Sequence, residues 1–144
     1  MAEVRRGTGA GADAVWSVLS DGWRLPTWVV GAARVDAVDA AWPAVGARLR
    51  YRIGAWPVLL PGVAEVTAST PGRELALHGR TPVGGVDVRL TLTAAAGGTE
   101  LLIAEDVVSG PARLVPARLR AAGIAARNVE TLRRLALLAE TPAT

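Results

Sequence analysis

Hydrophobic and polar residues alternate with a period of two through the middle of the chain, from residue 32 to residue 109. In the segment 47–54 (ARLRYRIG), Tyr51 and its apolar neighbours share one face while three arginines share the other. The segment 86–93 (VDVRLTLT) repeats this alternation. Such a pattern is typical of strands with one buried and one solvated face. Further strands are expected at 33–38, 64–69, 73–80 and 99–108, and a short first strand at 3–8.

Turn signals separate these strands: WPAVG, LPG, TPGR, TPVGG and AAGG. Because short loops join strands that pair side by side, we expect an antiparallel meander with one face buried against the core.

Helical periodicity flanks the strands. The segment 12–21 (ADAVWSVLSD) places Trp16 on an apolar face, so Trp16 is expected in the core. Pro26 limits the next segment to a short turn of helix on either side. From about residue 113 to residue 140, apolar positions recur about every 3.6 residues, which predicts one long C-terminal helix with a stripe formed by Ala125, Val129, Leu132, Ala136 and Ala139.

The order of these elements predicts an α+β fold in a single domain spanning 1–144. A strand comes first, then two short helices, about six strands and the long helix. One helix cannot cover the whole concave face of such a sheet. We therefore expect a cavity between sheet and helix, although side chains filling that space are an equal alternative.

The element order and local motifs resemble the START-like (SRPBCC) superfamily, most closely its bacterial branch of polyketide cyclases/dehydrases and lipid-transport proteins. The matching motifs are ADAVWSVLSD, PTWVVGAARVD, WPAVGARLRYRIG, GGTELLIAEDVVSGP and RNVETLRRLALLAE. This resemblance implies the helix-grip fold, in which a curved antiparallel sheet of seven strands wraps around the C-terminal helix. It also implies a ligand cavity between sheet and helix that the loop 81–86 (TPVGGV) gates. A simple hairpin turn without a gating role is an equally good interpretation of this loop.

Composition excludes several classes of function. The chain has no cysteine and a single histidine, so thiolate metal sites and three-histidine sites are excluded. Sixteen basic residues, all arginine, are interspersed with thirteen acidic ones, so no basic patch indicates nucleic-acid binding. The GTGAGA motif at 7–12 lacks the strand–helix alternation of a dinucleotide site. We expect no metal and no cofactor.

The chain also shows no targeting or membrane signal. No apolar run approaches the roughly 18 residues of a membrane span, and the N-terminal segment lacks the apolar stretch of a signal peptide. These features predict a cytoplasmic protein.

Glu105 is the candidate catalytic residue. If Leu101 and Ile103 face inward, Glu105 does as well, and a carboxyl group in an apolar cavity can act as a general acid or base. A salt bridge to an arginine is the alternative role. The opposite strand phase stays open, because Leu102 and Ala104 are also apolar.

His78, the single histidine, alternates with the inward-facing leucines of its strand, so it is expected on the solvent face.

The remaining candidates are expected to line the cavity. The Tyr51 hydroxyl and the Asn128 amide could contact a ligand, or each could satisfy a structural hydrogen bond. Trp28 lies near one end of the expected cavity, and Trp56 approaches it from the sheet side. Apolar contacts are expected from Leu77, Val88, Leu90, Ile103 and Leu132.

The neighbours of Asn128 on the last helix, Arg127 and Glu130, are expected in surface or loop-anchoring pairs.

The sequence thus predicts a protein that binds or carries a small-to-medium hydrophobic ligand of lipid or polyketide type. Two alternatives stay open. One is a polyketide cyclase or dehydratase, in which Glu105, Tyr51 or Asn128 promotes enolisation or loss of water. The other is a protein–protein interaction module without a ligand. Neither the ligand nor the choice between monomer and homodimer follows from the sequence.

Overall fold

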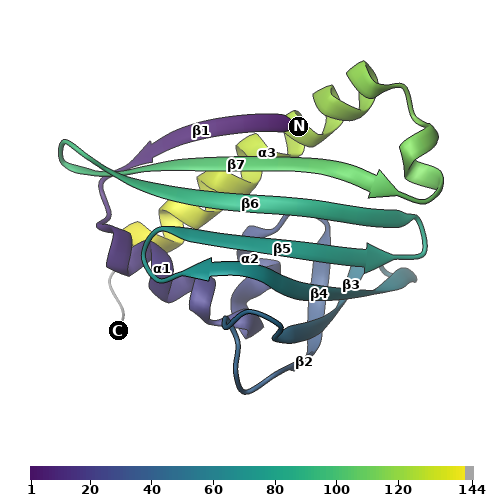
Figure 1. Ribbon diagram of the computed structural model, residues 1–144, viewed down its shortest axis with the longest axis horizontal. Helices are drawn as coiled ribbons and strands as arrows, with labels where there is room; N and C mark the ends of the chain where they lie inside the picture. Colours follow the sequence, from purple (N-terminus) through teal and green to yellow (C-terminus); the bar gives the residue numbers. More distant parts are fainter. Residues whose placement is uncertain (142–144) are drawn as a thin grey trace.

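The computed structural model describes residues 1–141, and within them seven strands form one antiparallel sheet that curves around a long C-terminal helix (Figure 1). This confirms the predicted α+β architecture. The elements in chain order are β1 (Ala2–Thr8), α1 (Ala12–Ser20), the 3-10 turn η1 (Gly22–Arg24), α2 (Leu25–Trp28), β2 (Ala32–Val38), β3 (Arg48–Ala55), β4 (Val58–Thr70), β5 (Glu74–Thr81), β6 (Gly84–Ala95), β7 (Gly98–Ser109), the 3-10 turn η2 (Pro111–Leu114) and α3 (Ala117–Glu140).

The strands follow the predicted meander. Their spatial order is β1-β7-β6-β5-β4-β3-β2, so each strand from β2 to β6 pairs with the next strand along the chain. β1 closes the other edge against β7, with Val4 opposite Ile103. The two short helical segments between β1 and β2 lie beside α3 on the same side of the sheet.

One predicted turn is wrong. The LPG motif lies inside β4, and the β3–β4 hairpin instead turns at Trp56 and Pro57. Pro61 is opposite Arg52 of β3, while pairing with β5 begins only at Val63. This end of β4 therefore has a single neighbouring strand, which is the position where a residue without a backbone N–H is tolerated.

The core lies where α1 and α3 pack on the concave face of the sheet. Val15, Val18 and Leu19 supply the buried face of α1, whereas Trp16 is only partly buried at its edge, which corrects its predicted core position. Trp42 is buried instead, and its indole N–H donates to the Leu19 carbonyl at 3.3 Å.

The buried stripe of α3 differs from the apolar stripe that the sequence predicts. Val129 is 55% exposed, while the neighbouring Asn128 is 1% exposed. The spacing of the buried residues keeps the helical period, but two polar side chains stand among them: the buried set is Ile124, Asn128, Thr131, Leu132, Leu135 and Ala136. Hydrophobicity alone therefore identifies Leu132 and Ala136 correctly but selects Val129 in place of the buried Asn128.

No helix within residues 1–141 has the length and apolar character required to span a membrane.

Candidate ligand cavity

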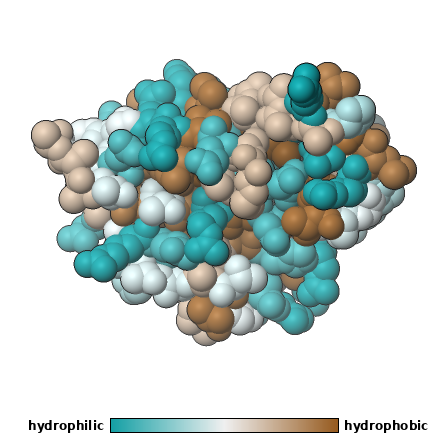
Figure 2. All heavy atoms as spheres, turned by 45° about the horizontal axis from the view of Figure 1, so that its top comes forward, coloured by the Kyte–Doolittle hydropathy of each residue, from teal (hydrophilic) through white to brown (hydrophobic). Residues whose placement is uncertain are grey.

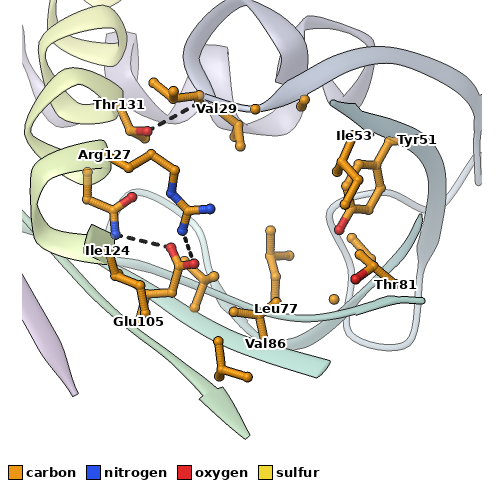
Figure 3. A pocket seen from close by; sticks show the side chains of 18 of the residues that line it. Val29, Tyr51, Ile53, Leu77, Thr81, Val86, Glu105, Ile124, Arg127 and Thr131 are labelled. Atoms are coloured by element: carbon orange, nitrogen blue, oxygen red, sulfur yellow. Dashed lines mark hydrogen bonds and ion pairs between the residues drawn. The ribbon is translucent and has the colours of Figure 1, made fainter. Parts of the chain in front are cut away.

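A cavity of about 400 Å³ lies between α3, the concave face of the sheet and the segment that joins α2 to β2 (Figure 3). This volume falls within the range of roughly 300–1,000 Å³ typical of small-molecule sites. The wall is mostly apolar: the lining residues are Leu25, Trp28, Val29, Val30, Gly31, Ala32, Tyr51, Ile53, Gly54, Ala64, Leu77, Gly79, Thr81, Val83, Gly84, Val86, Val88, Ile103, Glu105, Val107, Ala112, Ile124, Arg127, Asn128 and Thr131.

Small residues leave this space open. Ala64 and Gly79 line the concave face of the central strands, and Gly31 and Ala32 line the segment that faces them. A Cβ added at Gly79 would lie 3.1 Å from the Tyr51 hydroxyl, so a larger side chain there would take up cavity space. The alternative in which side chains fill the space under α3 is therefore not what the structure contains.

Glu105, Arg127 and Asn128 form a polar cluster on the α3 side of the cavity (Figure 3). Nη2 of Arg127 donates to Oε2 of Glu105, and Nδ2 of Asn128 donates to Oε1 of Glu105 at 3.1 Å. Glu105 is 5% exposed, so its inward register on β7 is confirmed. Both carboxylate oxygens have a partner, and the cationic partner offsets the cost of burying the negative charge.

The Arg127 guanidinium group has N–H donors that are not used in its pair with Glu105. Its Nε and Nη1 make no hydrogen bond to protein atoms within residues 1–141, and Figure 3 shows the guanidinium group reaching into the open space. Arg127 is expected in a surface or loop-anchoring pair, and its side chain is 38% exposed, but its partner is the buried Glu105 at the cavity wall. Its neighbour Glu130 does form the expected surface pairs, with Arg133 and Arg134.

Tyr51 faces this cluster from the opposite side of the cavity (Figure 3). Its ring covers Gly62, where a Cβ atom would lie 2.7 Å from the ring, and its hydroxyl reaches over Gly79. The hydroxyl has no hydrogen-bond partner among the described residues. Burial raises the pKa of this hydroxyl above its ordinary value of 10.0, the Glu105 carboxylate raises it further, and Arg127 partly opposes the change. Tyr51 therefore presents a neutral hydroxyl.

Trp28 forms an apolar wall. The residue is 3% exposed, and its indole Nε1 is the one buried side-chain polar atom without a hydrogen-bond partner in the described part of the chain. A buried donor left unpaired costs about 1–3 kcal/mol. The nitrogen is covered by protein on the cavity side too, so the ring contributes hydrophobic surface and no hydrogen bond.

α3 also holds the segment that joins α2 to β2. The Thr131 hydroxyl accepts a hydrogen bond from the backbone N–H of Val30 at 3.3 Å. One helix thereby supplies both the polar cluster and the anchor for the facing wall.

Seven of the ten predicted site residues line the cavity: Trp28, Tyr51, Leu77, Val88, Ile103, Glu105 and Asn128. The structure corrects the placement of the other three. Trp56 is at the tip of the β3–β4 hairpin and is 85% exposed. Leu90 and Leu132 are fully buried in the core beside α1, beyond the end of the cavity. Hydrophobic periodicity predicts correctly that these leucines point inward. It does not show whether an inward-facing residue lies in the packed core or at the cavity.

The exposed surface around the β5–β6 turn and η2 carries apolar side chains close to the cavity. Val83, Leu114, Val115 and Leu119 are exposed, and the Val83 carbonyl accepts a hydrogen bond from the N–H of Ala112 at 2.9 Å. Val83 and Ala112 also line the cavity. Figure 2 shows hydrophobic side chains interleaved with hydrophilic ones toward the right-hand end of the molecule.

His78 lies on the opposite, convex face, as predicted. Its Nδ1 is 2.6 Å from Oδ1 of Asp87 on the neighbouring strand, and neither residue lines the cavity. Within residues 1–141, no group of three or more His, Cys, Asp or Glu side chains is arranged to hold a metal ion.

Comparison with known proteins gives one family. A model of the family described as "Polyketide cyclase / dehydrase and lipid transport" matches residues 2–140. No curated protein matches the chain.

Solved structures share the fold. A Chromobacterium violaceum protein is 18% identical with a TM-score of 0.75, each chain covering 97% of the other. A Rhodobacter sphaeroides protein is 25% identical with a TM-score of 0.72, over 94% of this chain and 89% of that one. The Zhui aromatase/cyclase from a Streptomyces species is 19% identical with a TM-score of 0.71, over 96% and 92%.

Proposed function

The chain belongs to the polyketide cyclase/dehydrase and lipid-transport family of the SRPBCC superfamily, and from this premise we propose that it binds a small-to-medium hydrophobic ligand in the cavity beneath α3. One observation carries the proposal: a space of about 400 Å³ whose wall is apolar apart from a few polar groups. This is the composition of a small-molecule site, in which apolar burial supplies affinity and polar contacts supply orientation.

The free energy for binding would come from apolar surface removed from water. At about 25 cal/mol per Å², covering roughly 200 Å² of apolar ligand surface is favourable by about 5 kcal/mol before the costs of association. Leu77, Val86 and Ile103 offer such surface from three neighbouring strands.

The polar groups are suited to orienting the ligand. Arg127 offers hydrogen-bond donors on one side of the cavity and the Tyr51 hydroxyl faces it from the other. A ligand with an oxygen at one end would therefore have a preferred direction in the cavity.

A pair of tryptophan substitutions tests this proposal. Val86→Trp places a large ring in the cavity, whereas Leu114→Trp adds the same ring at a position that is 86% exposed and does not line the cavity. We expect calorimetric titration with acetylnaphthalene to show binding to the wild type and to Leu114→Trp, and at least tenfold weaker binding to Val86→Trp. Equal affinity of all three proteins would contradict the proposal.

A cyclase or dehydratase is the second candidate. The observation that favours it is the Tyr51 hydroxyl facing the Arg127 guanidinium across the cavity, because such donors can stabilise charge that develops on a ligand oxygen. Glu105 would take part as the partner of Arg127, since both of its oxygens already accept hydrogen bonds.

The variant Tyr51→Phe distinguishes the two candidate functions. A cyclase predicts that this variant loses turnover of a polyketone substrate while it keeps ligand affinity. A carrier predicts no turnover in either protein.

A further inference from the structure

The charges that face the cavity cancel. Besides Tyr51, the ionisable residues among those lining it are Glu105 and Arg127, and these two form an ion pair. The wall around them is apolar, with Ile103, Val107 and Ile124 nearby on β7 and α3. A bound molecule therefore meets no net charge from this pair, in which Glu105 is buried and the Arg127 side chain is 38% exposed.

The pair is nevertheless unequal in what it offers a ligand. Each oxygen of Glu105 accepts one hydrogen bond, Oε2 from Arg127 and Oε1 from Asn128. Arg127 has five N–H donors, and the interaction with Glu105 uses only those on Nη2. The donors that the cluster offers to a ligand are therefore the remaining N–H groups of Arg127.

We infer that the cavity selects uncharged ligands that carry an acceptor oxygen, such as a ketone, ester or amide, and that Glu105 sets this selectivity by compensating the charge of Arg127. The inference rests on the proposed ligand-binding function. Glu105 is here a positioning residue, because it acts on the ligand through Arg127.

Each other class of ligand is disfavoured for a separate reason. A carboxylate would bring a second negative charge to a guanidinium that Glu105 already neutralises. A pure hydrocarbon offers no acceptor to the donors of Arg127, so it gains no hydrogen bond there. A carbonyl oxygen pairs with those donors and adds no charge.

Three probes of matched size test this selectivity. Acetylnaphthalene carries a ketone, ethylnaphthalene a hydrocarbon group of the same size, and naphthoate a carboxylate at neutral pH. For the wild type we expect the ketone to bind about tenfold more tightly than the hydrocarbon, which is the value of one hydrogen bond to a charged donor. We expect naphthoate to bind at least tenfold more weakly than the ketone.

Substitution of Glu105 should reverse this order. In Glu105→Gln the shape is kept but Arg127 loses its compensating charge, so we expect naphthoate to gain at least tenfold and to become the tightest of the three ligands. A purely structural role of Glu105 would weaken all three probes together. In Arg127→Met, the preference for the ketone over the hydrocarbon should fall to about onefold. Glu130→Gln, in an exposed pair on the same helix, is the matched control and should keep the wild-type order.

The outcomes are distinguishable. Tightest binding of naphthoate to the wild type would overturn the inference while leaving ligand binding in the cavity intact, and this result needs no variant to fold. An unchanged order in a folded Glu105→Gln would also overturn it. Failure of all three probes to bind the wild type would overturn the proposed function together with the inference.

Discussion

Two glycines fix the position of the Tyr51 ring, and Gly62→Ala tests the consequence. A Cβ atom at Gly62 would lie 2.7, 2.9 and 3.0 Å from three atoms of the Tyr51 ring. Contacts this short are steric overlaps, so either the Tyr51 ring or strand β4 must move. Gly62 is buried, and its backbone conformation is open to alanine, so the expected effect is steric.

The magnitude follows from overpacking in a folded core. Insertion of one methyl group against a ring at this distance costs about 1–3 kcal/mol of the free energy of unfolding. The ring would move along the cavity wall, because the backbone of Gly79 lies so close beneath the hydroxyl that a Cβ built there would be 3.1 Å from it. We therefore expect weaker binding of acetylnaphthalene together with the loss of stability.

Denaturant unfolding of the wild type and four variants measures this effect. Gly7→Ala is the control: it lies on β1, and a Cβ there meets nothing within 4 Å, so its stability should stay unchanged or rise by about 0.4–1 kcal/mol. Tyr51→Ala alone and in combination with Gly62→Ala complete a double-mutant cycle. A coupling energy of about 1 kcal/mol or more is expected. The reasoning is refuted if Gly62→Ala costs no more than Gly7→Ala, or if the cycle shows no coupling.

Two further predictions concern ionisation. Burial raises the pKa of Tyr51, the only tyrosine, so its absorbance titration should have a midpoint above 10.0 in the native protein and near 10.0 in denaturant. The free energy of unfolding should therefore fall as the pH rises above 10.0. A native midpoint at or below 10.0 would contradict this. The Asp106 carboxylate accepts from Nε of Arg120 at 3.0 Å, which holds its pKa below the usual value, and Arg113 also pairs with it. Asp106→Asn should therefore cost about 1–2 kcal/mol and speed amide exchange at the start of α3. Glu130→Gln, in an exposed pair, should destabilise the protein much less, and equal losses would show that the Asp106 pairs add nothing.

Much of the fold follows from periodicity. Strict alternation in 47–54 and 86–93 marks β3 and β6, because each has one face on the core and one in water. The LPG motif misleads because the structure places Pro61 where β4 has one neighbour, and strand pairing is not visible in local sequence.

The site is less predictable than the fold. Alternation places Glu105 and Tyr51 on the concave face, and the polar amide beside the apolar stripe of the last helix marks Asn128 as a candidate, but the same pattern misses Arg127. Both lie toward the sheet because a buried carboxylate at Glu105 requires partners. The available signal was chemical: an inward-facing acid implies a cation within reach, and only tertiary structure shows which of sixteen arginines it is.

The central claim is that an apolar ligand occupies the space between the sheet and α3. NMR measurement of intermolecular contacts between acetylnaphthalene and the protein methyl groups tests it most directly. We predict contacts to Val86, Val88 and Ile103 on the cavity wall, and none to Leu114 or Leu119 on the exposed surface. Contacts confined to Leu114 and Leu119 would contradict the claim.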